Sequence, residues 1–143
     1  MKILALFILI FIASCGFLEP VDVVIEKDKI ILSEITTEIK CDPPLKRIRN
    51  EGSILVFIEE KWSTFFPWKQ IKLADGTVVD LDVTLIDSNG RSYSPLIFGR
   101  ADKALNLRFD PQIPKEASII SINLSSNSNI TLSKIVWHNF NPF

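Results

Sequence analysis

Apolar and polar residues alternate along much of the chain with a period of two, which is typical of a β-strand with one buried face. The clearest run covers residues 79–85, where four aliphatic residues alternate with Asp80, Asp82 and Thr84. Similar β-rich runs occupy residues 21–25, 29–32, 35–40, 54–59, 91–98, 105–109, 120–124 and 130–137. We therefore expect about eight or nine short strands and no long amphipathic helix.

Turn-forming residues separate these runs. Asp75-Gly76 and Asp87-Ser88-Asn89-Gly90 are hairpin sequences, and residues 125–129 form a polar turn. Pro95 should bend or end the strand that follows the second hairpin turn. Without an internal repeat or a linker, residues 21–143 are predicted to be a single all-β domain. The expected architecture is an antiparallel two-sheet β-sandwich, immunoglobulin-like or jelly-roll.

The first residues have the organisation of a secretory signal peptide. Lys2 is followed by an apolar run from residue 3 to residue 13 and then by small residues. That run is shorter than the roughly 20 residues that a membrane-spanning helix needs. Residues 1–14 are therefore expected to be removed.

The sequence Ile12-Ala13-Ser14-Cys15 resembles the lipobox of bacterial lipoproteins. The resemblance implies that the Cys15 thiol receives a diacylglyceryl group, that the chain is cut before Cys15, and that the new amino terminus is acylated, for example with palmitate. Residues 15–20 would then be a short lipidated tether. The alternative is an ordinary cleaved signal peptide whose Cys15 forms a disulfide with Cys41.

Two or more acyl chains hold a protein stably on a membrane. Residues 16–20 span at most about 17 Å when fully extended, so the domain would stay close to the bilayer. Gly16 stands where an inner-membrane retention signal of enteric bacteria has Asp. In a host with two membranes, the resemblance therefore favours the outer membrane of the cell envelope.

Composition narrows the function classes. Sixteen Lys plus Arg balance 17 Asp plus Glu, for a formal net charge of −1, so nucleic acid is a poor candidate partner. His138 is the only histidine, and no nucleophile motif accompanies it. We expect a structural role for His138, no catalytic residues, no metal site and no cofactor.

A short aromatic segment and Trp137 form the candidate interaction surface. Trp62, Phe65, Phe66 and Trp68 lie within seven residues flanked by lysines. Such side chains serve as protein hot spots, as glycan-stacking platforms or as anchors at a membrane interface. The alternative interpretation is a turn of helix in which Trp62, Phe65 and Phe66 plug one end of the sandwich, with Trp68 outside.

Three other features have ordinary structural explanations. Asp80 and Asp82 share the polar face of one strand but lack the remaining ligands of a calcium loop. Cys41 is expected to be a buried thiol if Cys15 carries lipid. Residues 46–49 form a small basic cluster, which is either a solvated loop or a contact with anionic headgroups.

These observations favour a non-enzymatic, membrane-anchored envelope lipoprotein that binds another protein. A glycan-binding module that uses Trp62, Trp68 or Trp137 as a platform is the alternative. A small envelope hydrolase with Asp80 or Asp82 as its base is a remote one. Beyond the lipobox, the sequence resembles no specific family.

Overall fold

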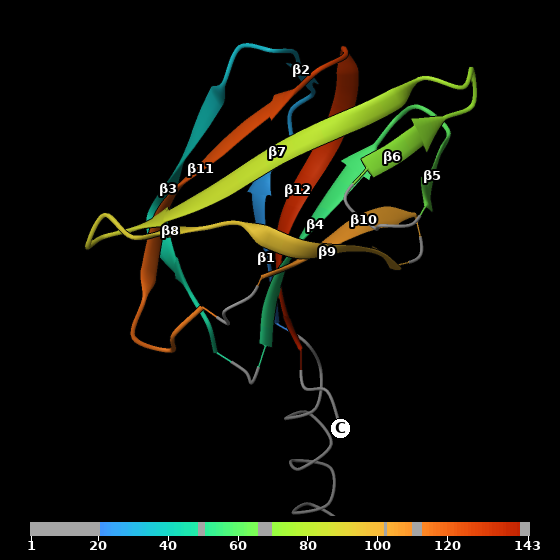
Figure 1. The fold of residues 1–143 in the computed structure, drawn as a ribbon. Coiled ribbons are helices and arrows are strands. Elements are labelled where there is room, and N and C mark those ends of the chain that lie inside the picture. Colours follow the sequence, from blue (N-terminus) through green and yellow to red (C-terminus); the bar gives the residue numbers. More distant parts are fainter. Residues whose placement is uncertain (1–20, 49–50, 66–69, 102, 110–112, 141–143) are drawn as a thin grey trace, which may run out of the picture.

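The computed structural model describes residues 21–48, 51–65, 70–101, 103–109 and 113–140. These residues form strands and their connections, with no helix among them. The strands are β1 (Val21–Glu26), β2 (Ile30–Leu32), β3 (Thr37–Lys46), β4 (Glu51–Ile58), β5 (Trp62–Phe65), β6 (Gln70–Leu73), β7 (Val78–Asp87), β8 (Ser92–Tyr93), β9 (Pro95–Ala101), β10 (Ala104–Phe109), β11 (Ser118–Ser126) and β12 (Ile130–Phe140). They form two antiparallel sheets that pack face to face, which confirms the predicted all-β sandwich (Figure 1).

The two sheets have similar layouts. Sheet A has the strand order β1-β12-β4-β10-β9, and β2 also pairs with β12. Sheet B has the order β3-β11-β7-β6-β5, and β8 also pairs with β7. The long strand β12 pairs with β4 along one side, and β1 and β2 share its other side. Each sheet therefore has a long inner strand against which two shorter segments are aligned end to end.

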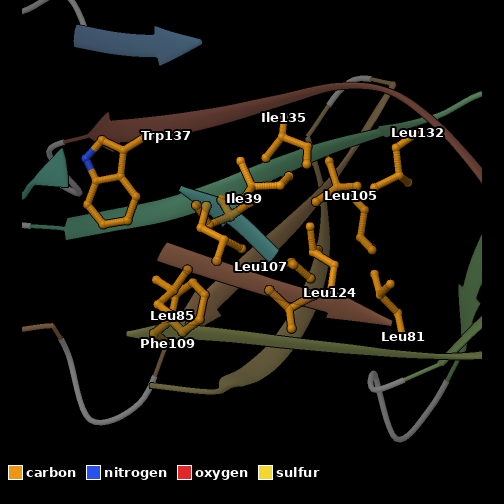
Figure 2. Packing of buried hydrophobic residues seen from close by; sticks show 14 of the residues in the cluster. Ile39, Leu81, Leu85, Leu105, Leu107, Phe109, Leu124, Leu132, Ile135 and Trp137 are labelled. Atoms are coloured by element: carbon orange, nitrogen blue, oxygen red, sulfur yellow. The ribbon is translucent and has the colours of Figure 1, made fainter. Parts of the chain in front are cut away.

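The core lies between the inner faces of the two sheets (Figure 2). The alternation of residues 79–85 predicts correctly which side chains of β7 enter the core. Its aliphatic residues Val79, Leu81, Val83 and Leu85 are all buried. Burying one such side chain stabilises the fold by about 1.5–3 kcal/mol. Asp80 and Asp82 point to the exposed face of the same strand.

The segment after the second hairpin turn changes sheet at Pro95. Ser92 and Tyr93 pair with β7 in sheet B, whereas the strand that begins at Pro95 pairs with β10 in sheet A. Proline has no N–H to donate to a ladder and has a fixed φ, so it suits the point where one pairing ends and another begins. The bend expected at Pro95 is thus a crossing between the layers.

Strand β11 departs from simple alternation. The sequence places Ile120, Ile122 and Leu124 on one face, but Ile120 is exposed while Ile119 and Ser121 are buried. The pairing of β11 shifts register between Ile119 and Ser121. A β-bulge inserts one extra residue and turns the side chains that precede it to the opposite face. The expected placement of Ile120 is therefore wrong.

Two side chains of β12 close one end of the sandwich. The indole N–H of Trp137 donates to the backbone oxygen of Lys46 at 3.1 Å, and the Oδ1 of Asn139 accepts the N–H of Ile48 at 3.0 Å. Both side chains are buried. Residues 46–48, which begin at the last residue of β3 in sheet B, are thus fixed against β12 of sheet A. We call this arrangement the β12 clamp.

Gly52 provides a test of the packing at the β12 clamp. A Cβ at Gly52 would lie 2.7 Å from Cζ2 of Trp137, whereas a Cβ at Gly99 would lie 3.7 Å from the nearest atom, the backbone oxygen of Asn106. Gly52→Ala should lower the free energy of unfolding by about 1–3 kcal/mol, the usual cost of overpacking. Gly99→Ala should change it by less than about 0.5 kcal/mol. Urea unfolding curves measure both, and equal midpoints would contradict the close packing of Trp137 on Gly52.

Candidate functional site

Exposed apolar side chains gather at one edge of sheet A. Among the described large apolar residues, three of the four most exposed lie here: Val24 at 51%, Ile31 at 68% and Ile35 at 79%. The neighbouring Val23 is also exposed. Adjacent strand residues point to opposite sides of a sheet, so exposure of both Val23 and Val24 indicates an edge that is open on both sides. We call β1, β2 and the residues up to Ile35 the β1–β2 edge.

This edge is open because β12 is the one partner of both strands in the described part of the chain. β1 pairs with residues 135–139 of β12, and β2 pairs with residues 130–132. No other described strand lies beyond them. The outward backbone groups of an edge strand are available to another chain.

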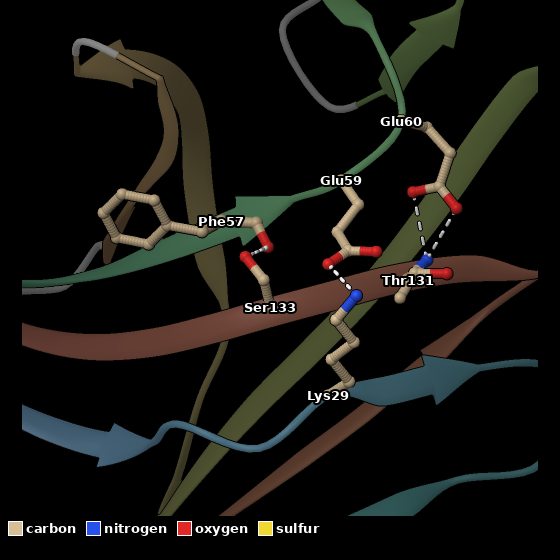
Figure 3. Close-up of polar contacts among 6 residues, drawn as sticks. All are labelled: Lys29, Phe57, Glu59, Glu60, Thr131 and Ser133. Atoms are coloured by element: carbon tan, nitrogen blue, oxygen red, sulfur yellow. Dashed lines mark hydrogen bonds and ion pairs between the residues drawn. The ribbon is translucent and has the colours of Figure 1, made fainter.

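A charged turn divides the edge into two short segments. The Oε1 of Glu26 accepts the N–H groups of Lys27 and Asp28, each at 2.9 Å. The Nζ of Lys29 lies 2.7 Å from Oε1 of Glu59, an ion pair that reaches across β12 (Figure 3). Proteins often place charges on edge strands to prevent unwanted pairing. Here charged residues cluster from Glu26 to Lys29, and apart from Asp22 the strand residues on either side of them are apolar.

The strand behind the edge is held firmly to β4. Both carboxylate oxygens of Glu60 accept the N–H of Thr131 at 3.0 Å, and the Ser133 hydroxyl donates to the backbone oxygen of Phe57 at 3.4 Å (Figure 3). The Ser133 contact lies at the point between residues 132 and 134 where the β12–β4 register shifts, and the Thr131 contact lies just before it. The edge therefore has a well-supported backing strand.

The edge ends in an open hollow at its far end. Residues Ser33, Glu34, Ile35, Asn127, Ser128 and Asn129 line a volume of about 540 Å³. The N–H of Ser126 donates to the backbone oxygen of Ser33 at 2.8 Å, which ties the end of the edge to sheet B. Ile35 is thus one of the residues that line a hollow continuous with the edge.

The aromatic segment begins as a strand, so the predicted turn of helix is wrong. Residues Trp62 to Phe65 form β5, which pairs with β6 and so has an extended backbone. The Trp62 ring is half-buried against the core, and the Arg100 guanidinium lies 5.3 Å from its centroid. Phe66 and Trp68 lie outside the described residues, as does the side chain of Phe65.

Trp137 does not belong to an interaction surface. Its side chain is 1% exposed, because it lies on the inner face of β12 beneath residues 46–48. The prediction that Trp137 contacts a partner or a sugar is therefore wrong. A glycan platform would have to use Trp62, whose ring is partly covered, and Trp68, which lies outside the described residues.

The carboxylate of Asp80 takes part in surface hydrogen bonds. It accepts from Nε2 of Gln70 and from Nδ2 of Asn127, the latter at 3.3 Å, while the N–H of Asp80 donates to Oδ1 of Asn127 at 2.8 Å. These contacts tie β6 and the polar turn after β11 to β7. Within the described ranges, no group of three His, Cys, Asp or Glu residues is placed to hold a metal ion.

Asp87 has the turn role that the sequence predicts. Its Oδ1 accepts the N–H groups of Asn89 at 2.8 Å and Arg91 at 2.9 Å, and its Oδ2 accepts the hydroxyl of Tyr93 at 2.9 Å. Burial of the carboxyl opposes its ionisation, but the N–H of Arg91 and the other donors outweigh this, and the pKa of Asp87 is lowered.

His138 and Cys41 are placed as structural residues. The Nδ1 of His138 lies 2.6 Å from Oδ1 of Asp22, its neighbour on β1. Cys41 is a buried free thiol, as predicted, and burial raises the pKa of its thiol to about 11. Cys15 lies outside the described residues.

The described ranges contain no helix with the length and hydropathy needed to cross a membrane. Comparison of the chain with protein-family models, with curated proteins and with solved structures gave no match. The case for a functional site therefore rests on geometry, and the β1–β2 edge is the strongest candidate.

The hydrogen bonds of Asp87 predict a pH dependence. A carboxyl whose pKa is lower in the folded state stabilises the fold above its unfolded pKa, about 3.9, and this contribution is lost as the pH falls through the folded value. Asp87→Asn should therefore be less stable than the parent protein at pH 7, and the difference should shrink below about pH 4. Urea unfolding from pH 3 to pH 7 measures this difference. A stability difference that grows as the pH falls would contradict the lowered pKa of Asp87.

Proposed function

We propose that this protein is a lipid-anchored protein of the bacterial cell envelope that binds another protein through the β1–β2 edge. The lipobox resemblance at Cys15 supports the anchor. The open edge with its exposed apolar side chains supports the binding role. No bond-making chemistry is part of the proposal.

The observation that carries the binding role is the coincidence of an open backbone edge with apolar side chains. Val24 and Ile31 lie on β1 and β2, which have no second partner in the described chain. A strand from another protein can extend such a sheet, because its backbone pairs with the edge while alternate side chains give specificity. Exposed apolar groups add binding free energy when the partner covers them.

The edge is also well oriented for an anchored protein. β1 begins at Val21, directly after the proposed tether, and the edge runs from there past β2 to Ile35 (Figure 1). A partner strand along this edge would run away from the tethered end. The partner could therefore reach sheet A without passing beneath the domain.

Neither alternative function gains comparable support. For a glycan-binding module, Trp137 is buried and one side of the Trp62 ring faces Arg100. For a hydrolase, the Asp80 carboxylate is engaged with Gln70 and Asn127. The edge thus remains the surface whose chemistry is best suited to binding.

Photo-crosslinking in the natural host tests the proposal. A photoreactive phenylalanine derivative replaces Ile31, and the matched control replaces Ile120, an exposed isoleucine of β11 in the other sheet. We expect a discrete adduct with one envelope protein from position 31 and none from position 120. Mass spectrometry of the adduct identifies the partner and the strand that it contributes.

A second substitution tests whether the contact is strand addition. Val24→Lys places a charge on the edge, which disfavours pairing with another strand. Since Val24 is half-exposed, the domain should keep its stability within about 0.5 kcal/mol. We expect this substitution to remove most of the adduct formed from position 31. Equal adducts from positions 31 and 120, or an adduct unaffected by Val24→Lys, would contradict the proposed edge contact.

A further inference from the structure

One strongly exposed apolar residue, Ile48, lies away from the β1–β2 edge. Ile48 is 61% exposed and follows Lys46 and Arg47 in the chain. The Lys46 side chain is exposed as well. An apolar side chain beside basic ones is a combination typical of protein segments that lie at a membrane surface.

The β12 clamp places Ile48 beside the start of the domain. The N–H of Ile48 donates to Oδ1 of Asn139 at 3.0 Å, and Asn139 is the cross-strand neighbour of Val21. The Trp137 indole holds the backbone oxygen of Lys46 at the same end. Residues 46–48 therefore have a fixed backbone position next to the point where the chain enters β1 (Figure 1).

The short tether makes this end the one nearest the bilayer. Five residues separate Cys15 from Val21, and they span at most about 17 Å when extended. If Cys15 carries lipid, Val21 lies at most about 22 Å from Cys15, because six extended residue steps join them. Residues 46–48 lie beside Val21, so they are within reach of the headgroups.

We propose that residues 46–48 form a membrane-contacting tip, in which the exposed Ile48 side chain enters the headgroup region and the exposed Lys46 side chain contacts lipid phosphates. This inference rests on the proposed lipidation of Cys15. Long basic side chains can lay their methylene stems along an apolar surface while their charges stay in the polar layer. The lipid anchor supplies most of the affinity, and the tip sets the orientation of the domain.

The orientation has a structural consequence for the β1–β2 edge. With the tip on the membrane, β2 lies toward the other end of the sandwich, and the connection from β2 to β3, which contains Ile35, follows it there (Figure 1). Lys115 and Glu116 are exposed in the turn before β11, whose first residue pairs with Lys46. Their charges cancel, and Lys46 is the exposed basic side chain of the tip, since Arg47 is half-buried.

Environment-sensitive labels at the two ends test the inference. The mature protein, purified from membranes with its lipid, carries Ile48→Cys or the matched control Ile35→Cys, each labelled with a nitrobenzoxadiazole dye. Cys41 should label slowly because it is buried and its thiol pKa is raised to about 11. The labelled proteins are reconstituted into vesicles of phosphatidylcholine with 30% phosphatidylglycerol.

We expect the dye at position 48 to emit at shorter wavelength and to be quenched by lipids that carry a nitroxide near the headgroup. The dye at position 35 should emit as in water and escape quenching. Adding Lys46→Gln to the Ile48→Cys protein should reduce the emission shift, because the tip then loses its exposed charge. Thermal unfolding of each unlabelled variant checks that folding is retained, as expected for exposed positions.

Flotation of the same samples with the vesicles separates this inference from the proposed anchor. Protein that floats while the dyes at positions 48 and 35 both emit as in water overturns the tip and leaves the anchor standing. Equal quenching at both positions also overturns the tip, because it excludes a fixed orientation. Protein that does not float overturns the anchor and the tip together.

Discussion

Strand β12 pairs with three other strands and also contributes to the core, and the two candidate contact surfaces follow from these contacts. Its inner face contributes Ile135 and Trp137 to the core, and one side pairs with β4. Its other side is too long for β1 alone, so β2 occupies the remainder. Because β1 and β2 lie last in the sheet, their outer sides stay open. Because β12 continues to Asn139, it also reaches and fixes residues 46–48.

Much of the fold could be predicted from local sequence. The period of two in residues 79–85 is a direct result of a strand with one buried face, and that face is the buried one. Asp87 and Gly90 also have the turn roles expected of them, since Gly90 has a positive φ of 77° and Asp87 accepts the turn N–H groups. Local backbone chemistry decides these features, so they need no knowledge of distant partners.

The features that could not be predicted depend on distant partners. The bulge at Ile119 and Ser121 depends on how β11 pairs with both β3 and β7, and the sheet change at Pro95 depends on where β10 lies. Likewise Ile31 and Leu32 look alike in the sequence, yet Ile31 is exposed and Leu32 is fully buried. Which strand lies at an edge is set by non-local pairing, so the candidate site could not be located from the sequence. The opposite error occurs at Trp137, which the sequence suggested as a surface contact residue but which the fold buries.

A β-sandwich supports many unrelated functions, so the fold alone does not choose among them. The proposed anchor at Cys15 would relate the exposed surfaces of this domain to one another, because it would fix which end of the sandwich faces the bilayer. The direct test is the intact mass of the protein purified from its natural membrane. The account predicts a chain that begins at Cys15 and carries two or three acyl groups, with Cys41 as a free thiol. A chain with an unmodified Cys15, or with Cys15 joined to Cys41, would contradict it.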